Sequence, residues 1–480
     1  MAEQSLKDKT AKGLFWGGVS NGVQQLLGML FGIYLARILN AEDYGLVGML
    51  AIFSGIASTI INSGFTVALT NKQEATHRDY NAVFWFTFFA SSILYFILFC
   101  FAPLIARFYD RPELVQLSRI IFVGFFFSGI GMVPYAVMFK QLMVKEQAKI
   151  DIVAMLMSGI VGLTCALKGY AYWALAWQSL VYVASGSILR CYYAPWRPTL
   201  KFDLHPLKEM FPFSIKLLFT NIFQQVNNNV FSVLLGRFYS ASQLGFFSQG
   251  QKWMGMGNLL ISGMIQQVVQ PVLVQVGDDL NRKLNVFRKL QRFVAFVAFP
   301  AFLGLAFIAE DFIIVTIGDK WLPSVIFLRI LSIWGIAYVF MTLYTQLIVE
   351  RGASDIYLKG FILTGLSQLL VVLCMLNWGA VWMTIAYVIV YYVTLFYWFY
   401  YVHRFIRIKL LDIFKDIFPY MGITLISIGV ATLLASFVEN VYFSLVLKIL
   451  LTAFLYILIC YLSDSQIVRE TMIFLRNAFK

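Results

Sequence analysis

Amide side chains recur in two stretches of the chain, residues 21–45 and 221–245. In each stretch they stand at positions i, i+3 and i+4 of an apolar segment, which places them on one face of a helix. Amides both donate and accept hydrogen bonds, as recognition of sugar hydroxyls requires. The residues are Asn21, Gln24 and Gln25 in the first stretch, and Asn221, Gln224 and Gln225, followed by Asn228, in the second.

The two stretches are similar beyond their amides. Aligned without gaps, eight of the 25 positions are identical, where chance would give about two, so the sequence predicts an internal duplication with an offset of 200 residues. A polar stripe on a membrane helix cannot face lipid. It therefore faces either a helix interface, where amides hold helices together, or a water-filled cavity shared by two related halves.

Composition sets the class of protein. Of the 480 residues, 60% are hydrophobic and only 13% are charged, which leaves too little polar surface for a soluble domain. We expect an all-α polytopic membrane protein. The five cysteines are scattered without CxxC spacing, so neither a disulfide framework, a metal site nor a cofactor is expected.

Fourteen apolar segments are long enough to cross a bilayer. We expect two six-helix bundles, residues 1–208 and 209–402, around a central cavity, and a final part, 403–480, with two added helices. Within this part, 409–418 is amphipathic and is expected to lie in the membrane interface. The segments are 13–36, 45–70, 81–106, 119–139, 152–168, 171–190, 213–236, 246–276, 293–309, 322–349, 360–377, 379–402, 417–438 and 441–462.

Basic residues orient these segments. The 37 Lys and Arg residues concentrate in the connections on the same side as the N-terminus, which predicts that both termini are cytoplasmic. The basic clusters are then topology determinants that face anionic lipid. No aromatic and basic platform accompanies them, so nucleic acid is not expected as a partner.

Charges inside the spans indicate what a cavity would bind. No Asp or Glu lies inside the segments as drawn, whereas Lys252, Arg329 and Lys448 do. Each of these three cations either faces the cavity or extends to the membrane surface, and Lys448 fits the second role better. Lys216 is either a contact for incoming anionic substrate or a topology anchor. With Gln266 on the eighth span, these residues predict a cavity for a polar, anionic substrate.

Four motifs give the chain a family resemblance. They are LARILNAEDYG at 35–45, PYAVMFKQLMVK at 134–145, GYAYWAL at 169–175 and GDKW at 318–321. With these motifs the chain resembles polysaccharide transporters, or lipid-linked oligosaccharide flippases, of the multidrug/oligosaccharidyl-lipid/polysaccharide exporter superfamily, of the colanic-acid and teichuronic-acid type.

The resemblance implies a bacterial cytoplasmic membrane protein that moves a polyprenyl-diphosphate-linked repeat unit to the outer leaflet by alternating access, as a monomer. Polymerases and glycosyltransferases would be its neighbours. Outward movement of negative charge is favourable by about 2.3 kcal/mol per charge per 100 mV. Because no span as drawn holds a carboxylate for proton transfer, we expect the membrane potential to contribute directly.

Two other functions remain open. One is a cation-coupled multidrug antiporter of the same superfamily, which the lack of an acidic residue in the spans argues against. The other is a polyprenyl-dependent glycosyltransferase or polymerase, for which Glu42 and Asp43 would be the metal ligands or the base. The second copy of the duplicated stretch has Ser242 and Gln243 there, so we do not expect an enzyme.

Overall fold

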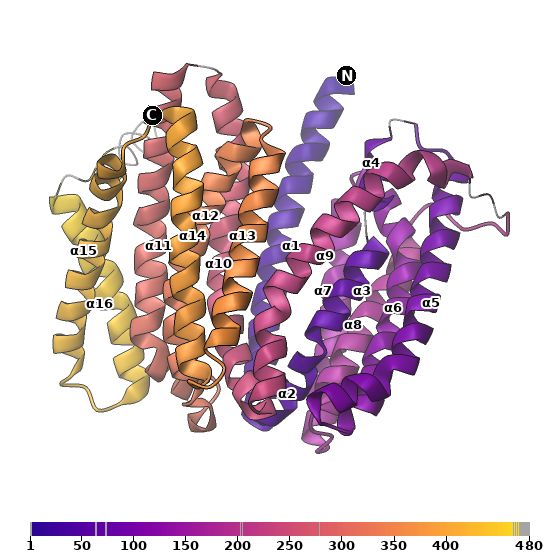
Figure 1. The fold of residues 1–480 in the computed structure, drawn as a ribbon, viewed down its shortest axis with the longest axis horizontal. Helices are drawn as coiled ribbons and strands as arrows, with labels where there is room; N and C mark the ends of the chain where they lie inside the picture. The colour runs from indigo at the N-terminus through magenta and orange to yellow at the C-terminus, as the bar shows by residue number, and fades with distance from the viewer. Residues whose placement is uncertain are drawn as a thin grey trace. The chain divides into compact units, whose positions relative to one another are not determined.

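The computed structural model of the chain is entirely helical in the part that it describes, which is residues 2–62, 65–72, 74–201, 203, 205–277, 279–463, 465, 467 and 469 (Figure 1). Contacts between residues divide the chain into two compact units, Met1–Gly245 and Phe246–Lys480, called unit 1 and unit 2 below. Helix α9 (His205–Phe238) belongs to unit 1 because it packs on helices of that unit, and the two six-helix bundles stay a prediction.

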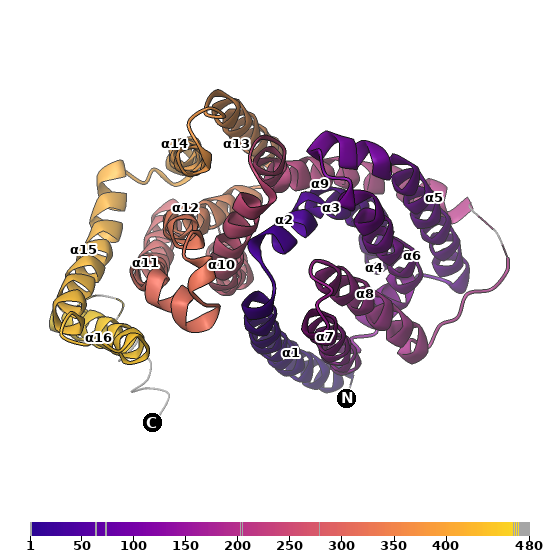
Figure 2. The same cartoon turned by 90° about the horizontal axis from the view of Figure 1, so that it is seen from below.

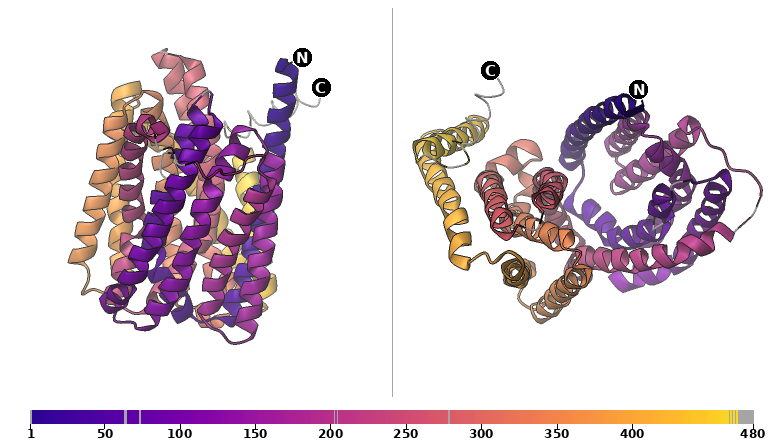
Figure 3. Two further views of the ribbon diagram at one scale, coloured as in Figure 1. Left: turned by 90° about the vertical axis from the view of Figure 1, so that its right-hand side faces the viewer. Right: turned by 90° about the horizontal axis from the view of Figure 1, so that it is seen from above.

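Unit 1 is a ring of long helices (Figure 2). In this ring α1 packs on α7, α7 on α8, α8 on α6 and α6 on α5, and α9 packs on both α3 and α5. The long helices run side by side along the unit (Figure 3). Their bounds are α1 Ala2–Ile38, α2 Ala41–Met49, α3 Ala51–Asn62, α4 Phe65–Asn71, α5 His77–Tyr109, α6 Glu113–Lys140, α7 Val144–Leu167, α8 Trp173–Tyr193 and α9 His205–Phe238.

Unit 2 is built around α11 and α12. Helix α11 packs on α12, α15 and α16, and α14 packs on α12 and α13. The last two helices, α15 and α16, lie against each other at the edge of this unit (Figure 1). The bounds are α10 Ala241–Val276, α11 Leu280–Thr316, α12 Ser324–Glu350, α13 Ser354–Cys374, α14 Ala380–Ile406, α15 Leu410–Ala435 and α16 Val441–Leu462, with a 3₁₀ turn at Asp319–Trp321.

Ten helices in the described residues are long and apolar enough to cross a membrane, or eleven if the bent pair of α1 and α2 counts as one span. The chain is therefore a multi-pass membrane protein, while the number of fourteen spans stays a prediction. The second expected span is not one helix: the structure divides it into α2, α3 and α4. Residues 410–418 of the expected interfacial segment form the first turns of α15 and continue into its apolar part, and their position in the membrane interface stays a prediction.

The two short turns expected from the sequence are present. Helix α7 ends at Leu167 and α8 begins at Trp173, with Gly169 at φ +78° between them. Helix α13 ends at Cys374 and α14 begins at Ala380, directly after Gly379 at φ +94°. Glycine adopts positive φ without the steric cost that a Cβ brings, and in both hairpins the two helices pack on each other.

The duplicated stretches meet at their glycines inside unit 1. A Cβ added at Gly45 would lie 1.8 Å from the carbonyl oxygen of Ala241, and one added at Gly245 would lie 1.8 Å from that of Ala41. The contact is reciprocal, as two copies of one motif make when they face each other. Glycine is required at both positions because only hydrogen leaves room for the opposite backbone.

Buried charges tie the helices of unit 2 together. Lys283 of α11 is fully buried, and its Nζ lies 2.8 Å from Oε1 of Glu350 at the end of α12. Arg288 and Arg292 of α11 both contact the carboxylate of Asp416 on α15, at 2.7 and 3.0 Å. Charges removed from water need partners of opposite sign, so the first pair joins α12 to α11 and the second group joins α15 to α11.

We predict that Gly45→Ala lowers the free energy of unfolding by about 1–3 kcal/mol or more, because about 1–3 kcal/mol is the usual cost of inserting a methyl group into a packed site. The melting temperature in detergent, followed by intrinsic fluorescence, measures this. Gly22→Ala is the matched control, since nothing lies within 4 Å of its Cβ, and alanine there favours the helix. Equal melting temperatures for the two variants would contradict the close contact.

We also predict that Glu350→Gln destabilises unit 2 by about 3–5 kcal/mol, because it leaves the buried ammonium of Lys283 without a counter-charge. The control is Glu310→Gln, which removes the exposed partner of Arg329 at 3.2 Å and should cost about 0–1 kcal/mol. Thermal unfolding in nanodiscs compares the two variants. A similar loss in both would show that burial of the pair is unimportant.

Candidate functional site

Six polar side chains line one pocket of about 270 Å³ in unit 1. Four come from α9 at positions i, i+3, i+4 and i+7, and two come from α3. No lining residue is apolar, although the flanking helix α3 is otherwise largely apolar in sequence. The residues are Asn221, Gln224, Gln225, Asn228, Ser58 and Thr59.

A glycine lets α9 approach α3 at this pocket. A Cβ at Gly55 would lie 2.7 Å from the side-chain nitrogen of Gln225, so the amide occupies the space that a larger residue would take. Asn229 Nδ2 donates a hydrogen bond of 2.9 Å to the carbonyl oxygen of Gln225. The amides of α9 thus serve both roles that the sequence left open, helix contact at Gln225 and pocket lining along the same stripe.

The amides of the first copy lie elsewhere in unit 1, on α1. Gln24 donates a hydrogen bond of 2.9 Å to Oγ of Ser20. Asn21 is exposed and Gln25 is half-buried, and none of the three lines the pocket on α9. The structure therefore brings together the second group of predicted residues and not the first. The side chain of Lys216 lies outside the described residues.

The other predicted residues belong to unit 2. The ammonium of Lys252 lies 5.5 Å from the centre of the Trp253 ring, and Gln266 is exposed further along α10. Arg329 on α12 pairs with Glu310 on α11 at 3.2 Å, and both side chains are about half exposed. The carboxylate of Glu310 thus already neutralises the charge of Arg329. The sequence analysis missed this partner because the expected span ended at residue 309.

A second polar pocket in unit 1, of about 340 Å³, contains residues that the sequence analysis missed. Asp151 of α7 and Arg190 of α8 face each other there, with Nη2 of Arg190 donating to Oδ1 of Asp151 at 2.6 Å. Their side chains are 24% and 23% exposed. Ser58 lines this pocket as well as the first, so the two polar regions adjoin on α3.

The expectation that spans contain no carboxylate is wrong. Asp151 lies inside α7, since this helix begins at Val144 and not at 152, and Asp311 lies inside α11, where it pairs with Lys448 of α16. Lys448 therefore has a partner within the protein and does not need to reach the membrane surface.

Hairpin geometry gives a signal for the missed pair. Asp151 precedes the end of α7 at Leu167 by 16 residues, and Arg190 follows the start of α8 at Trp173 by 17. In an antiparallel hairpin, residues at equal distance from the turn lie at the same height.

The acidic pair considered for catalysis has structural roles. The carboxylate of Asp43 accepts a hydrogen bond of 2.8 Å from the backbone nitrogen of Asn40 and so caps the start of α2. Glu42 pairs with Arg111 at 2.7 Å. Among the residues that the structure describes, no group of three or more His, Cys, Asp and Glu side chains could hold a metal ion.

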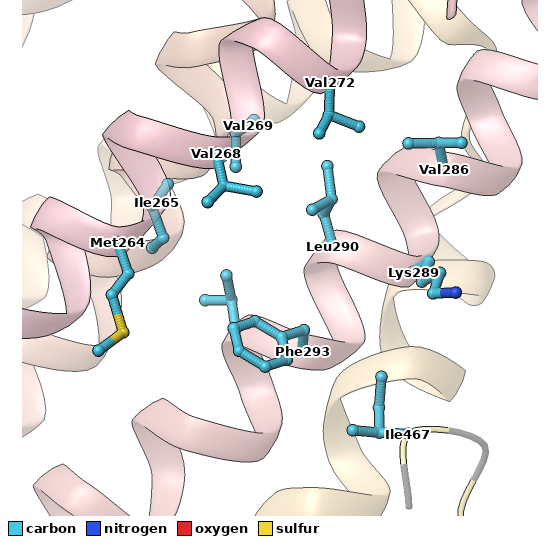
Figure 4. A pocket seen from close by; sticks show the side chains of 11 residues that line it. Met264, Ile265, Val268, Val269, Val272, Val286, Lys289, Leu290, Phe293 and Ile467 are labelled. Atoms are coloured by element: carbon cyan, nitrogen blue, oxygen red, sulfur yellow. The ribbon is translucent and has the colours of Figure 1, made fainter. Parts of the chain in front are cut away.

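Unit 2 has an apolar groove of about 680 Å³ between α10 and α11 (Figure 4). Met264, Val268 and Val272 of α10 face Leu290 and Phe293 of α11 across it (Figure 4). Lys289 and Ile467 also line the groove. Such a surface accommodates a hydrocarbon chain.

Sequence comparison identifies relatives in polysaccharide biosynthesis. Residues 34–326 match a family described as Polysaccharide biosynthesis protein. The chain is 25% identical over 354 residues to the teichuronic acid biosynthesis protein TuaB of Bacillus subtilis, covering 73% of each chain. It is 24% identical over 363 residues to the lipopolysaccharide biosynthesis protein WzxC of Escherichia coli, covering 74% of this chain and 73% of the relative.

Comparison with solved structures identifies the fold. The chain is similar to the lipid II flippase MurJ in an inward closed conformation, with a TM-score of 0.77, 13% identity, and coverage of 94% of this chain and 99% of MurJ. It is also similar to an inward-facing multidrug resistance MATE family transporter, with a TM-score of 0.62, 15% identity, and coverage of 80% and 94%. At these identities the likeness concerns the fold alone.

We predict that water reaches the pocket on α9. In a background without the five native cysteines, Asn228→Cys should react with a charged, membrane-impermeant thiol reagent, because its side chain is exposed in a polar pocket. Ser232→Cys, one turn along the same helix and 7% exposed, is the matched control and should react at least about tenfold more slowly, since the thiolate must be hydrated. Equal labelling would contradict a hydrated pocket.

Proposed function

Because this chain belongs to the polysaccharide biosynthesis proteins of the multidrug/oligosaccharidyl-lipid/polysaccharide exporter superfamily, whose members are transporters and not enzymes, we propose that it is a flippase. Its cargo is a polyprenyl-diphosphate-linked oligosaccharide repeat unit. It moves this cargo from the inner to the outer leaflet of the bacterial cytoplasmic membrane by alternating access, for surface polysaccharide export.

The observation that carries this proposal is the pocket lined only by amides and hydroxyls in a membrane protein. Burial of such groups away from water costs free energy unless they find hydrogen-bond partners. A glycan supplies these partners along its whole length, and in its absence water does. Amides also lack net charge, so they can release the glycan after each hydrogen bond is exchanged for one to water.

The apolar groove of unit 2 suits a polyprenyl chain. Apolar side chains, among them Val268, Leu290 and Phe293, form most of its lining, which suits a hydrocarbon chain. We propose that a segment of the polyprenyl chain lies in this groove while the rest stays in the bilayer. The protein then lowers only the free energy of moving the polar head, and no covalent step is needed.

The antiporter alternative gains one observation, the carboxylate of Asp151 inside α7. A cation-coupled transporter needs such a group to hold its ion or proton. Here Arg190 already contacts this carboxylate at 2.6 Å, which favours glycan transport. We expected the membrane potential to contribute directly because no span as drawn held a carboxylate, and Asp151 inside α7 removes that premise.

The remaining features follow from the family and the charge pattern. We propose fourteen spans with both termini in the cytoplasm, two repeats of six helices, and a monomer as the transporting form. Polysaccharide polymerases and glycosyltransferases that make and use the lipid-linked repeat unit are the proposed neighbours.

We predict that proteoliposomes containing the protein exchange a fluorescent polyprenyl-diphosphate oligosaccharide between leaflets, scored with a membrane-impermeant lectin. Asn228→Leu should slow this exchange by about tenfold, because a lost hydrogen-bonding group costs about 1–3 kcal/mol and 1.4 kcal/mol is a factor of ten. Asn281→Leu, an equivalent change at an exposed position of α11, should leave the rate unchanged.

Three results would contradict the proposal. They are the absence of protein-dependent exchange, lengthening of the glycan by the protein, and extrusion of a cationic dye in place of the lipid-linked glycan.

A further inference from the structure

The pocket around Asp151 and Arg190 has the groups that bind a sugar ring. Hydroxyl groups project from α3, α6 and α8, and the guanidinium of Arg190 lies 5.4 Å from the centre of the Tyr135 ring. The pocket has a volume of about 340 Å³, which corresponds to roughly eleven water molecules at about 30 Å³ each. A hexose has roughly a dozen non-hydrogen atoms, about as many as the oxygen atoms of that number of water molecules. The polar lining residues are Ser58, Ser128, Tyr135, Asp151, Tyr182, Ser187 and Arg190.

The charge pair keeps groups available for a ligand. Only one contact joins its side chains, from Nη2 of Arg190 to Oδ1 of Asp151. Nε of Arg190 is buried and has no hydrogen-bond partner among the described residues. A carboxylate accepts hydrogen bonds and a guanidinium donates them, so together they match neighbouring hydroxyls, each of which can do both.

The sign of the charges selects among ligands. A charged ligand would have to separate this pair: an anion would take Arg190 from Asp151, and a cation would take Asp151 from Arg190. In both cases one half-buried charge would lose its partner. A neutral polyol can bridge the two side chains without separating them. The pocket also adjoins the amide pocket through Ser58, so a glycan in one region reaches the other.

We propose that this pocket is a subsite for one uncharged sugar ring of the cargo, whose neighbouring hydroxyls bind Asp151 and Arg190. This inference rests on the proposed function and adds the class of sugar and the residues that recognise it. All lining residues belong to unit 1, so the subsite is complete within one compact unit. Arg190 and Asp151 then determine which glycans the protein accepts.

A binding experiment tests the subsite apart from transport. Saturation-transfer NMR of the purified protein in nanodiscs would use the methyl glycosides of glucose, galactose, mannose and N-acetylglucosamine, with methyl glucuronide as the anionic probe. At least one neutral glycoside should bind, and Asp151→Asn or Arg190→Gln should weaken its binding by about tenfold, the effect of about 1.4 kcal/mol. Binding of the glucuronide alone, or of no neutral glycoside, would overturn the proposal.

Two further variants separate recognition from folding. Gly186→Ala places a Cβ 3.5 Å from Nη1 of Arg190, an ordinary contact that narrows the pocket and keeps the charge pair, and it should also weaken binding. Arg78→Gln with Asp203→Asn removes an exposed ion pair elsewhere in unit 1 and should change nothing. Unaltered glycoside binding in Gly186→Ala and in Asp151→Asn would overturn the proposal.

Transport distinguishes the subsite from a coupling site. In proteoliposomes, Asp151→Asn should slow the exchange of the glycosylated lipid more than that of polyprenyl diphosphate without sugar. An equal loss for both lipids would assign the pair to coupling or to stability and overturn the subsite. Exchange of neither lipid by the unaltered protein, with the neutral glycoside still bound, would contradict the proposed flippase and leave the sugar subsite in place.

Discussion

The structure depends on one constraint: a polar or charged group within an apolar helix must find its partner inside the protein, because lipid offers none. Lys283 with Glu350, Asp151 with Arg190 and Lys448 with Asp311 all satisfy it across pairs of helices. Each of these contacts joins two neighbouring helices. The amides of α9 and the hydroxyls of α3 line a pocket, where a polar cargo can exchange hydrogen bonds with them.

The duplicated motif supplies a second contact that holds the fold together, the close packing of two glycines. Gly45 and Gly245 each accept the backbone of the opposite copy, so the two turns pack without side chains between them. The amides that precede these glycines have diverged in role: Asn228 lines a pocket with Ser58, whereas Gly28 at the equivalent position leaves the first stripe shorter. One motif thus supplies a packing contact in both copies and a polar pocket in the second copy.

The sequence predicted most helices from the length of the apolar segments, and the tight hairpins from glycines between them. It predicted the amide face of α9 from helical spacing, and all three are local signals. It did not predict the breaks that divide α2, α3 and α4, where no proline marks the chain. The pair of Asp151 and Arg190 was missed because a carboxylate one residue outside an expected span was counted as a loop residue, and only the fold shows that α7 begins earlier. Ser58 and Thr59 had no signal of their own, since hydroxyls are common in membrane helices.

The central claim is that the glycan passes along the polar surface of unit 1. Photo-crosslinking tests it most directly: a polyprenyl-diphosphate oligosaccharide with a diazirine on its sugar is irradiated with the protein in nanodiscs, and the labelled peptides are identified by mass spectrometry. The account predicts labels on α3 around Ser58 and on α9 around Asn228, which an excess of free oligosaccharide abolishes. Labels confined to helices of unit 2, or insensitive to the free glycan, would contradict it.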